Sequence, residues 1–222
     1  MKKILICGNY GAKNLGDELI LSGLLKLISE IEQEGGEKFA IQVMTADPRR
    51  TKEIHTIETV RIFPTGIRSI IQSLFSKDLK KTFQAVGESD LILFGGGDLL
   101  NEEEAYSMYL WGLHGKIFQW FRKPYIIIGQ SFSWPSKRLN KKIIQSIFEK
   151  AKAVFVRDED SKKVLEKLNI TKNIEVTTDL IFALRDESKA EERENKAGII
   201  LRNYKKIKIE DLNKKIEQFK EI

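Results

Sequence analysis

The sequence predicts an α/β fold in which a doubly wound, mostly parallel, Rossmann-like sheet forms the first domain. Short apolar runs alternate with helical patterns along residues 1–184, and this alternation is typical of a parallel sheet with helices on both faces. The apolar run at residues 4–7 leads into a loop with three glycines, and the run at residues 90–94 leads directly into three more. Loops at the carboxyl ends of strands carry the ligand sites of such sheets.

The opening unit is predicted to be a strand, a glycine-containing loop and a helix. The helix has apolar residues at helical spacing, namely Leu19, Ile20, Leu24, Leu27, Ile28 and Ile31. Gly8, Gly11 and Gly16 allow positive φ or close approach of a ligand, and Asp17 and Glu18 lie where an N-cap and first-turn acids belong. The helix N-terminus favours an anion, but these carboxylates oppose a phosphate. The glycine spacing matches neither the dinucleotide nor the P-loop motif. The alternative interpretation, that this segment is only a tight turn capped by Asp17, therefore stays open.

The later elements follow the same alternation. Strands are predicted at residues 39–44, 59–63, 90–94, 124–130, 153–156 and 174–177, and helices at residues 49–55, 67–86, 103–121, 137–151 and from 158–161 to about 168. Residues 185–196 are dense in Glu, Lys and Arg and predict a linker. Residues 197–222 predict one further βα unit, which cannot bury its apolar face alone. We therefore expect the sequence to end inside a second domain, and the 222-residue chain alone to be catalytically silent.

Composition narrows the function class. The chain has 222 residues, 41% hydrophobic and 32% charged, which suffices for one full domain and part of another. The net charge of +6 suits an anionic substrate or membrane headgroups, and no basic-aromatic motif indicates nucleic acid. Cys7, the single cysteine, is expected in the core of the first strand. His55 is isolated, and His114 stands alone on an aromatic helix expected to be core or interface, so no metal site is predicted. No signal peptide or membrane span is visible, and we expect a cytoplasmic protein.

Four segments together resemble the polysaccharide pyruvyltransferase family. They are residues 8–11 through 14–18, residues 94–100, residues 156–159 with Ser161 and Leu165, and residues 178–179, while residues 198–202 look like the opening strand of that family's second domain. The resemblance implies a two-domain architecture like that of GT-B glycosyltransferases, with the active site between the domains. It also implies transfer of a pyruvyl group from phosphoenolpyruvate to a sugar of a cell-surface polysaccharide or its lipid-linked precursor, forming a pyruvate ketal without a cofactor or metal.

The sequence departs from the family pattern in two places. The family usually reads Gly-Gln-Gly-x-Gly-Pro after its fifth strand, whereas this chain has Gly129-Gln130-Ser131-Phe132-Ser133-Trp134-Pro135. Serines thus replace two glycines, and a tryptophan is added. The family's Arg-x-His motif, which the resemblance places in the second domain with the general acid, is absent from these residues. No catalytic residue is therefore assigned.

Arg157 is the first choice for the group that clamps the donor. It follows a predicted strand, and a guanidinium fork fits a carboxylate or phosphate bidentately; by resemblance it matches the family's donor-binding arginine. A salt bridge to Asp158 or Asp160 is the structural alternative, and Asp158 and Ser161 are expected to be helix caps. The other predicted substrate or donor contacts are Gly11, Asn14, Gly16, Asp17, Gly95, Gly96, Gly97, Asp98, Gln130, Asp179 and Arg202.

The expected partners are phosphoenolpyruvate and a glycan acceptor, with no nucleic acid. Peripheral association with the inner face of the membrane and a homo-oligomer stay open, as the resemblance and the basic charge are compatible with both. Two other functions also stay open. One is a glycosyltransferase that uses a nucleotide sugar on the same scaffold. The other is a non-catalytic ligand-binding or assembly domain, which the serine-substituted loop and the missing motif would suit.

Overall fold

The computed structural model describes residues 1–64, 77–102 and 106–185, which belong to one compact unit, Met1–Arg185. Except for Arg185, the predicted linker at residues 185–196 and the predicted βα unit at residues 197–222 lie outside the described residues. The same holds for the first half, residues 67–76, of the helix predicted at residues 67–86. The domain boundaries therefore remain predictions.

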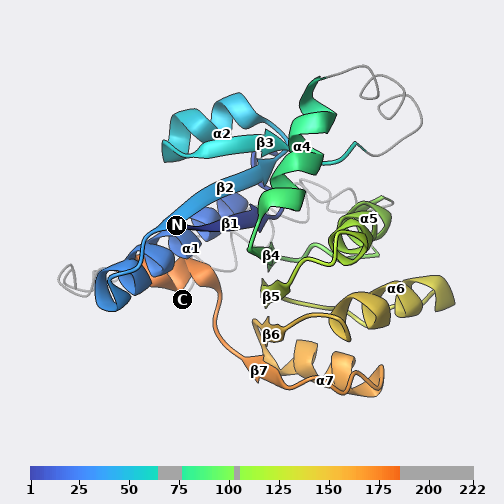
Figure 1. The fold of residues 1–222 in the computed structure, drawn as a ribbon. Coiled ribbons are helices and arrows are strands. Elements are labelled where there is room, and N and C mark those ends of the chain that lie inside the picture. The colour runs from blue at the N-terminus through green and yellow to red at the C-terminus, as the bar shows by residue number, and fades with distance from the viewer. Residues whose placement is uncertain (65–76, 103–105, 186–222) are drawn as a thin grey trace, which may run out of the picture. The chain divides into compact units, whose positions relative to one another are not determined.

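The described elements alternate between strand and helix along the chain (Figure 1). In chain order they are β1 (Lys2–Cys7), α1 (Leu15–Gly35), β2 (Phe39–Thr45), α2 (Pro48–His55), β3 (Glu58–Arg61), α4 (Lys77–Glu88), β4 (Leu91–Gly97), α5 (Ser107–Trp120), β5 (Tyr125–Gln130), α6 (Arg138–Phe148), β6 (Ala153–Val156), α7 (Glu159–Lys167), β7 (Ile174–Val176) and the 3₁₀ helix η1 (Leu180–Leu184).

The described strands form one sheet in the order β3-β2-β1-β4-β5-β6-β7, and every neighbouring pair is parallel. The predicted Rossmann-like α/β fold is thereby confirmed. The strand order reverses at β1, which pairs with β2 on one side and with β4 on the other. In sheets of this kind, ligands bind at such a switch point, beyond the carboxyl ends of the two strands.

The sheet is covered on both faces, as the apolar runs of its strands require. Along β1, Ile4 and Ile6 pack in one hydrophobic cluster with α1 and η1, whereas Leu5 and Cys7 pack in another with helices α4, α5, α6 and α7. Figure 1 shows these two groups of helices on opposite sides of the sheet. Cys7 is buried as expected, and burial raises the pKa of its thiol.

Helix α5 is core on one side only. Trp111, His114 and Phe118 are buried, whereas Tyr106, just before the helix, and Trp120 at its end are exposed. The prediction of a core helix is therefore right for the inward face. None of the helices in the described parts of the chain combines the length and apolarity needed to cross a bilayer.

Candidate functional site

The candidate site is built at the carboxyl ends of the parallel strands, beginning with the loop that joins β1 to α1. Tyr10 holds this loop in place: its hydroxyl donates to the Gly95 carbonyl of β4 at 2.9 Å. Its own carbonyl accepts the Ala46 N–H and the Thr45 hydroxyl, each at 2.9 Å. Tyr10 is buried, and burial raises the pKa of its phenol. The loop is thus fastened to both strands that flank β1.

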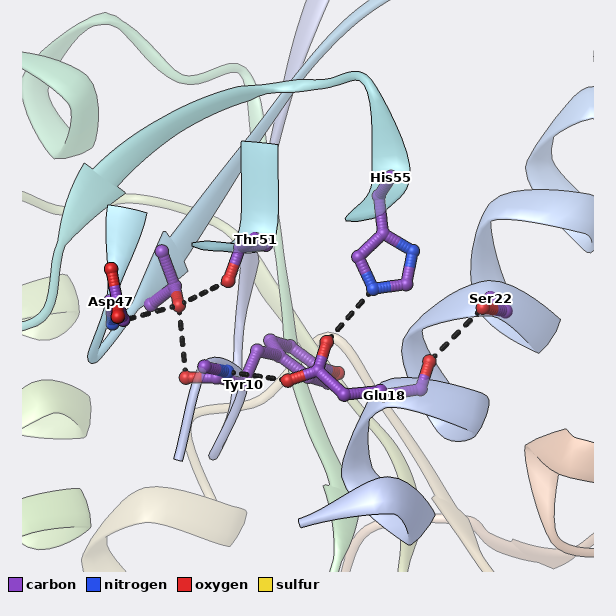
Figure 2. Close-up of polar contacts among 8 residues, drawn as sticks. Tyr10, Glu18, Ser22, Asp47, Thr51 and His55 are labelled. Carbon is purple, nitrogen blue, oxygen red and sulfur yellow. Dashed lines mark hydrogen bonds and ion pairs between the residues drawn. The ribbon is translucent and has the colours of Figure 1, made fainter. Parts of the chain in front are cut away.

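A buried Glu18–His55 pair fastens the same loop to the helices (Figure 2). Glu18 Oε2 lies 2.9 Å from His55 Nε2, and Glu18 Oε1 accepts the Gly11 N–H at 2.8 Å. The two side chains are only 9% and 5% exposed. The prediction that His55 is isolated is wrong, because α2 brings it against the first turn of α1. Gly11 has φ +75°, and a Cβ there would collide with Thr45 Oγ1, so packing requires a glycine here.

Asn14, not Asp17, is the N-cap of α1. Asn14 has extended backbone, and its Oδ1 accepts the Gly16 N–H at 3.0 Å. The helix therefore begins at Leu15 and places Asp17 inside its first turn, so the predicted cap role of Asp17 is wrong. Asp17 instead accepts a hydrogen bond from Asn9 Nδ2 at 2.9 Å. A first-turn acid still complements the helix dipole.

The spacing of the three glycines after residue 94 predicts a loop. In the structure they are instead the last residues of β4. Gly95, Gly96 and Gly97 have φ values of 144°, 93° and 80° and are buried. A Cβ on Gly95 would collide with the Ile128 carbonyl, and one on Gly96 would lie 2.5 Å from Ile20 Cγ2. These two glycines are therefore explained by close packing.

The ends of β4 and α1 meet at Gly97 and Asp17. A Cβ on Gly97 would lie 3.4 Å from Asp17 Oδ1, an ordinary contact distance, so the two predicted site residues are neighbours. Asp98 follows directly, and its Oδ2 accepts from Asn101 Nδ2 at 2.8 Å. The structure thus brings two carboxylate-bearing segments from opposite sides of the switch point to one place.

Gln130 ends β5 and is fully buried. Its Nε2 donates to the Phe94 carbonyl at 3.3 Å, whereas its Oε1 is buried without a hydrogen-bond partner among the described residues. A buried acceptor of this kind normally has a partner, from protein, water or ligand. Gln130 is therefore the described site residue whose polar group is incompletely satisfied.

Arg157 follows β6, and two side chains from neighbouring strand ends orient its guanidinium. Nη1 donates to Asp179 Oδ2 at 3.0 Å, and Nη2 donates to Ser131 Oγ at 2.6 Å. The Arg157 and Asp179 side chains are 35% and 21% exposed. Asp179 Oδ1 also accepts the Ile181 N–H at 3.1 Å, which fixes the carboxylate at the start of η1. The bonds from Arg157 to Asp179 and Ser131 engage two of the five N–H groups of its guanidinium.

The predicted salt bridge from Arg157 to Asp158 or Asp160 is wrong. Asp158 is the N-cap of α7, as predicted, and accepts the Ser161 N–H at 2.7 Å, whereas Asp160 pairs with Lys163. Ser161 is not a cap: its hydroxyl accepts the Phe132 N–H at 2.9 Å and so holds the loop after β5. Parallel pairing of β6 with β7 places Asp179 within reach of Arg157.

The predicted site residues therefore form two groups at one edge of the sheet. Asn14, Gly16, Asp17, Gly97 and Asp98 lie at the ends of β1 and β4, while Gln130, Arg157 and Asp179 lie at the ends of β5, β6 and β7. Arg202 lies outside the described residues. Across the described ranges, no three His, Cys, Asp or Glu residues gather as a metal ion would need.

Fold and site together define a doubly wound α/β domain with polar strand-end loops and an oriented arginine. The chain belongs to the polysaccharide pyruvyl transferase family: the family model described as "Polysaccharide pyruvyl transferase" matches residues 14–221. The family resemblance predicted from the four segments is thereby confirmed.

Among solved structures, the chain is similar to the crystal structure of Anabaena Alr3699/HepE in complex with UDP and glucose, with 13% sequence identity and a TM-score of 0.48. The match covers 81% of this chain and 45% of that one, so this chain corresponds to less than half of that protein's length. A comparison with curated proteins gives no match.

Proposed function

We propose that the protein transfers the pyruvyl group of phosphoenolpyruvate to a sugar of a polysaccharide or its lipid-linked precursor, and that Arg157 clamps the donor. Family membership supports a transferase of this class. The observation that carries the donor assignment is the guanidinium at the end of β6, held by Asp179 and Ser131 so that three N–H groups are left for a ligand. A guanidinium fork matches the planar carboxylate or the phosphate of the donor.

The reaction needs two anions clamped and two hydroxyls positioned. The enol phosphate of phosphoenolpyruvate is protonated at its methylene, and a sugar hydroxyl adds to the resulting cation. Phosphate then leaves, a second hydroxyl of the same sugar closes the ring, and both hydroxyl protons are released. Arg157 would offset the negative charge of the donor and hold it in register with the acceptor. The general acid is not assigned to a described residue.

The acceptor sugar would contact the other group of site residues, at the ends of β1 and β4. The carboxylates of Asp17 and Asp98 are suited to accept hydrogen bonds from sugar hydroxyls. Gln130 Oε1 lacks a partner among the described residues and would accept a hydroxyl or a bridging water. Because Gln130 pairs with Gly97 in the sheet and lies one strand from Arg157, it belongs to both groups.

Donor binding by the wild type, Arg157→Ala and a matched control tests the proposal. Arg49 is a suitable control because it is an exposed arginine on α2, far along the sheet from β6. Calorimetric titration with phosphoenolpyruvate should show a Kd about ten-fold higher for Arg157→Ala, since a charge-assisted contact is lost, and no change for Arg49→Ala. In a form of the protein that also carries a complete second domain, phosphate release with a glycan acceptor should fall in the same order.

Two results would contradict the proposal. One is equal phosphoenolpyruvate binding by a folded Arg157→Ala variant and the wild type, with the fold checked by circular dichroism. The other is stabilisation of the wild type by a nucleotide sugar but not by phosphoenolpyruvate, which would indicate a glycosyltransferase instead.

A further inference from the structure

Trp134 is exposed on a loop that is otherwise well anchored. It lies between β5 and α6, and 49% of it is exposed, whereas Phe132 and Pro135 beside it are buried. The Phe132 N–H donates to Ser161 Oγ at 2.9 Å, and its ring packs edge-on against Phe148 with centroids 5.0 Å apart. The indole is thus presented to solvent by residues that are themselves fixed in the core.

The far end of the loop is fixed by Glu102. Its carboxylate accepts hydrogen bonds from the Ser136 N–H at 2.9 Å, the Lys137 N–H at 3.1 Å and Asn140 Nδ2 at 2.6 Å. Partial burial acts to raise the pKa of Glu102, but these hydrogen bonds outweigh it and lower the pKa to about 2. Glu102 therefore stays charged across the physiological range, and the loop stays attached at both of its ends.

Trp134 forms one wall of a groove whose other wall is a face of α7. The groove has a volume of about 440 Å³ and is lined by Trp134, Asp160, Lys163, Val164 and Lys167. The four α7 residues follow the i, i+3, i+4, i+7 pattern of one helix face. From α6, Lys141 Nζ lies 4.5 Å from the centroid of the indole ring. Lys141 thus lies over the indole and two further lysines line the groove, against one aspartate, Asp160, which pairs with Lys163 at 3.0 Å.

We propose that this groove, the Trp134 groove, binds a saccharide that carries an acidic group, as a subsite for the acceptor glycan. A flat indole face complements the apolar C–H face of a pyranose ring. The excess of lysines complements a carboxylate or phosphate on the sugar, and Asp160 can accept hydrogen bonds from hydroxyls.

The Trp134 groove is close enough to the donor clamp to share one glycan with it. Ser131, which bonds Arg157, is three residues before Trp134. Three residues of extended chain span at most about 10 Å, a length that a short oligosaccharide covers. As an acceptor subsite the groove rests on the proposed function, but its affinity for an acidic saccharide can be measured without any reaction.

Affinity electrophoresis of the full 222-residue chain tests the groove. The gels contain polygalacturonate, neutral dextran or polyglutamate, and Trp120→Ala serves as the matched control because Trp120 is 74% exposed on a different surface, at the end of α5. Polygalacturonate should retard the wild type and Trp120→Ala alike. The apparent Kd of Trp134→Ala should be about ten-fold higher, as expected for loss of an aromatic contact. Lys163→Ala/Lys167→Ala should weaken binding and reduce its salt dependence.

The inference is overturned if polygalacturonate retards Trp134→Ala as strongly as the wild type, or retards neither. It is also overturned if polyglutamate retards the wild type as strongly as polygalacturonate does, since charge alone would then explain binding. Arg157→Ala separates this outcome from the donor assignment. This variant should bind polygalacturonate as the wild type does, whereas its Kd for phosphoenolpyruvate should be about ten-fold higher. Absence of phosphoenolpyruvate binding in the wild type would refute the proposed reaction and leave the polygalacturonate result standing.

Discussion

His114 should make the stability of this protein depend on pH. The residue is fully buried in α5, and both ring nitrogens are engaged: Nε2 accepts the Phe63 N–H at 3.1 Å, and Nδ1 lies 2.8 Å from the Leu110 carbonyl. Because an N–H points at Nε2, the proton of the neutral ring is on Nδ1, where it is donated to Leu110. Burial lowers the pKa of His114 from 6.5 to about 4, although the Leu110 hydrogen bond acts in the opposite direction.

The sign and size of the effect follow from proton linkage. Between the two pKa values the unfolded chain binds a proton at His114 and the folded chain does not, so acid favours unfolding. The stabilising contribution is fully present above pH 6.5 and is lost as the pH falls through the folded-state pKa of about 4. From about pH 7.5 to about pH 5, the lowered pKa should reduce the free energy of unfolding by ~2 kcal/mol.

Urea unfolding at the two pH values measures this loss. The wild type should lose ~2 kcal/mol more than His114→Gln does, because carboxylates contribute equally to both proteins. His55→Gln removes the other of the two histidines and serves as the control. Because it retains His114, it should still show the loss of ~2 kcal/mol that His114 causes. An identical pH dependence in the wild type and His114→Gln would refute the reasoning. Should His114→Gln fail to fold, NMR titration of the wild type decides: the His114 ring resonances should not shift between pH 7.5 and pH 5.

Three further substitutions test the site. Ser131→Ala removes one of the two hydrogen bonds that orient Arg157 without changing any charge, and it should raise the Kd for phosphoenolpyruvate about five-fold while leaving the melting temperature unchanged. In a form that also carries a complete second domain, Asp17→Asn should lower phosphate release more than it lowers the melting temperature, because it changes the charge at the switch point but keeps a side chain of the same shape. Glu18→Gln should lower the free energy of unfolding by ~1–3 kcal/mol in urea titrations, because the Gly11 N–H and its buried histidine partner lose a charged acceptor.

The sheet and helices were predictable because their signals are local. Apolar runs and helical spacing predict the described strands and α-helices to within a few residues at the ends that can be compared, whereas the 3₁₀ helix η1 is not predicted. The start of α1 was not predictable in this way, since Asn14 and Asp17 are both good N-cap residues and the backbone conformation of Asn14 decides between them. The glycines that end β4 were taken for a loop because glycine is common in turns. Their packing against Ile20 and Ile128 depends on the tertiary fold.

The contacts of the candidate site were less predictable because they join residues far apart in sequence. His55 is 37 residues from Glu18, and Asp179 is 22 residues from Arg157. A usable signal nevertheless existed. Once the strand order is assumed, the ends of β1 and β2 are neighbours, as are those of β6 and β7, and polar residues after these strands must meet. Residue spacing alone does not contain that order, which is why the salt-bridge alternative for Arg157 names Asp158 and Asp160 and not Asp179.

On the two proposals above, the loop after β5 would connect donor binding with acceptor binding. Ser131, which stands where the resemblance leads to an expectation of glycine, bonds Arg157, and the added Trp134, three residues later, lines the basic groove. The backbone between them is held by Ser161 and, beyond, by Glu102, so the guanidinium and the indole cannot move independently over large distances. Transfer between two substrates is accelerated mainly by holding both in register. On the proposed function, the serine at position 131 and the added tryptophan would suit an enzyme that selects one acidic acceptor, because the residue that orients Arg157 and the residue that would bind the acceptor lie on the same anchored segment.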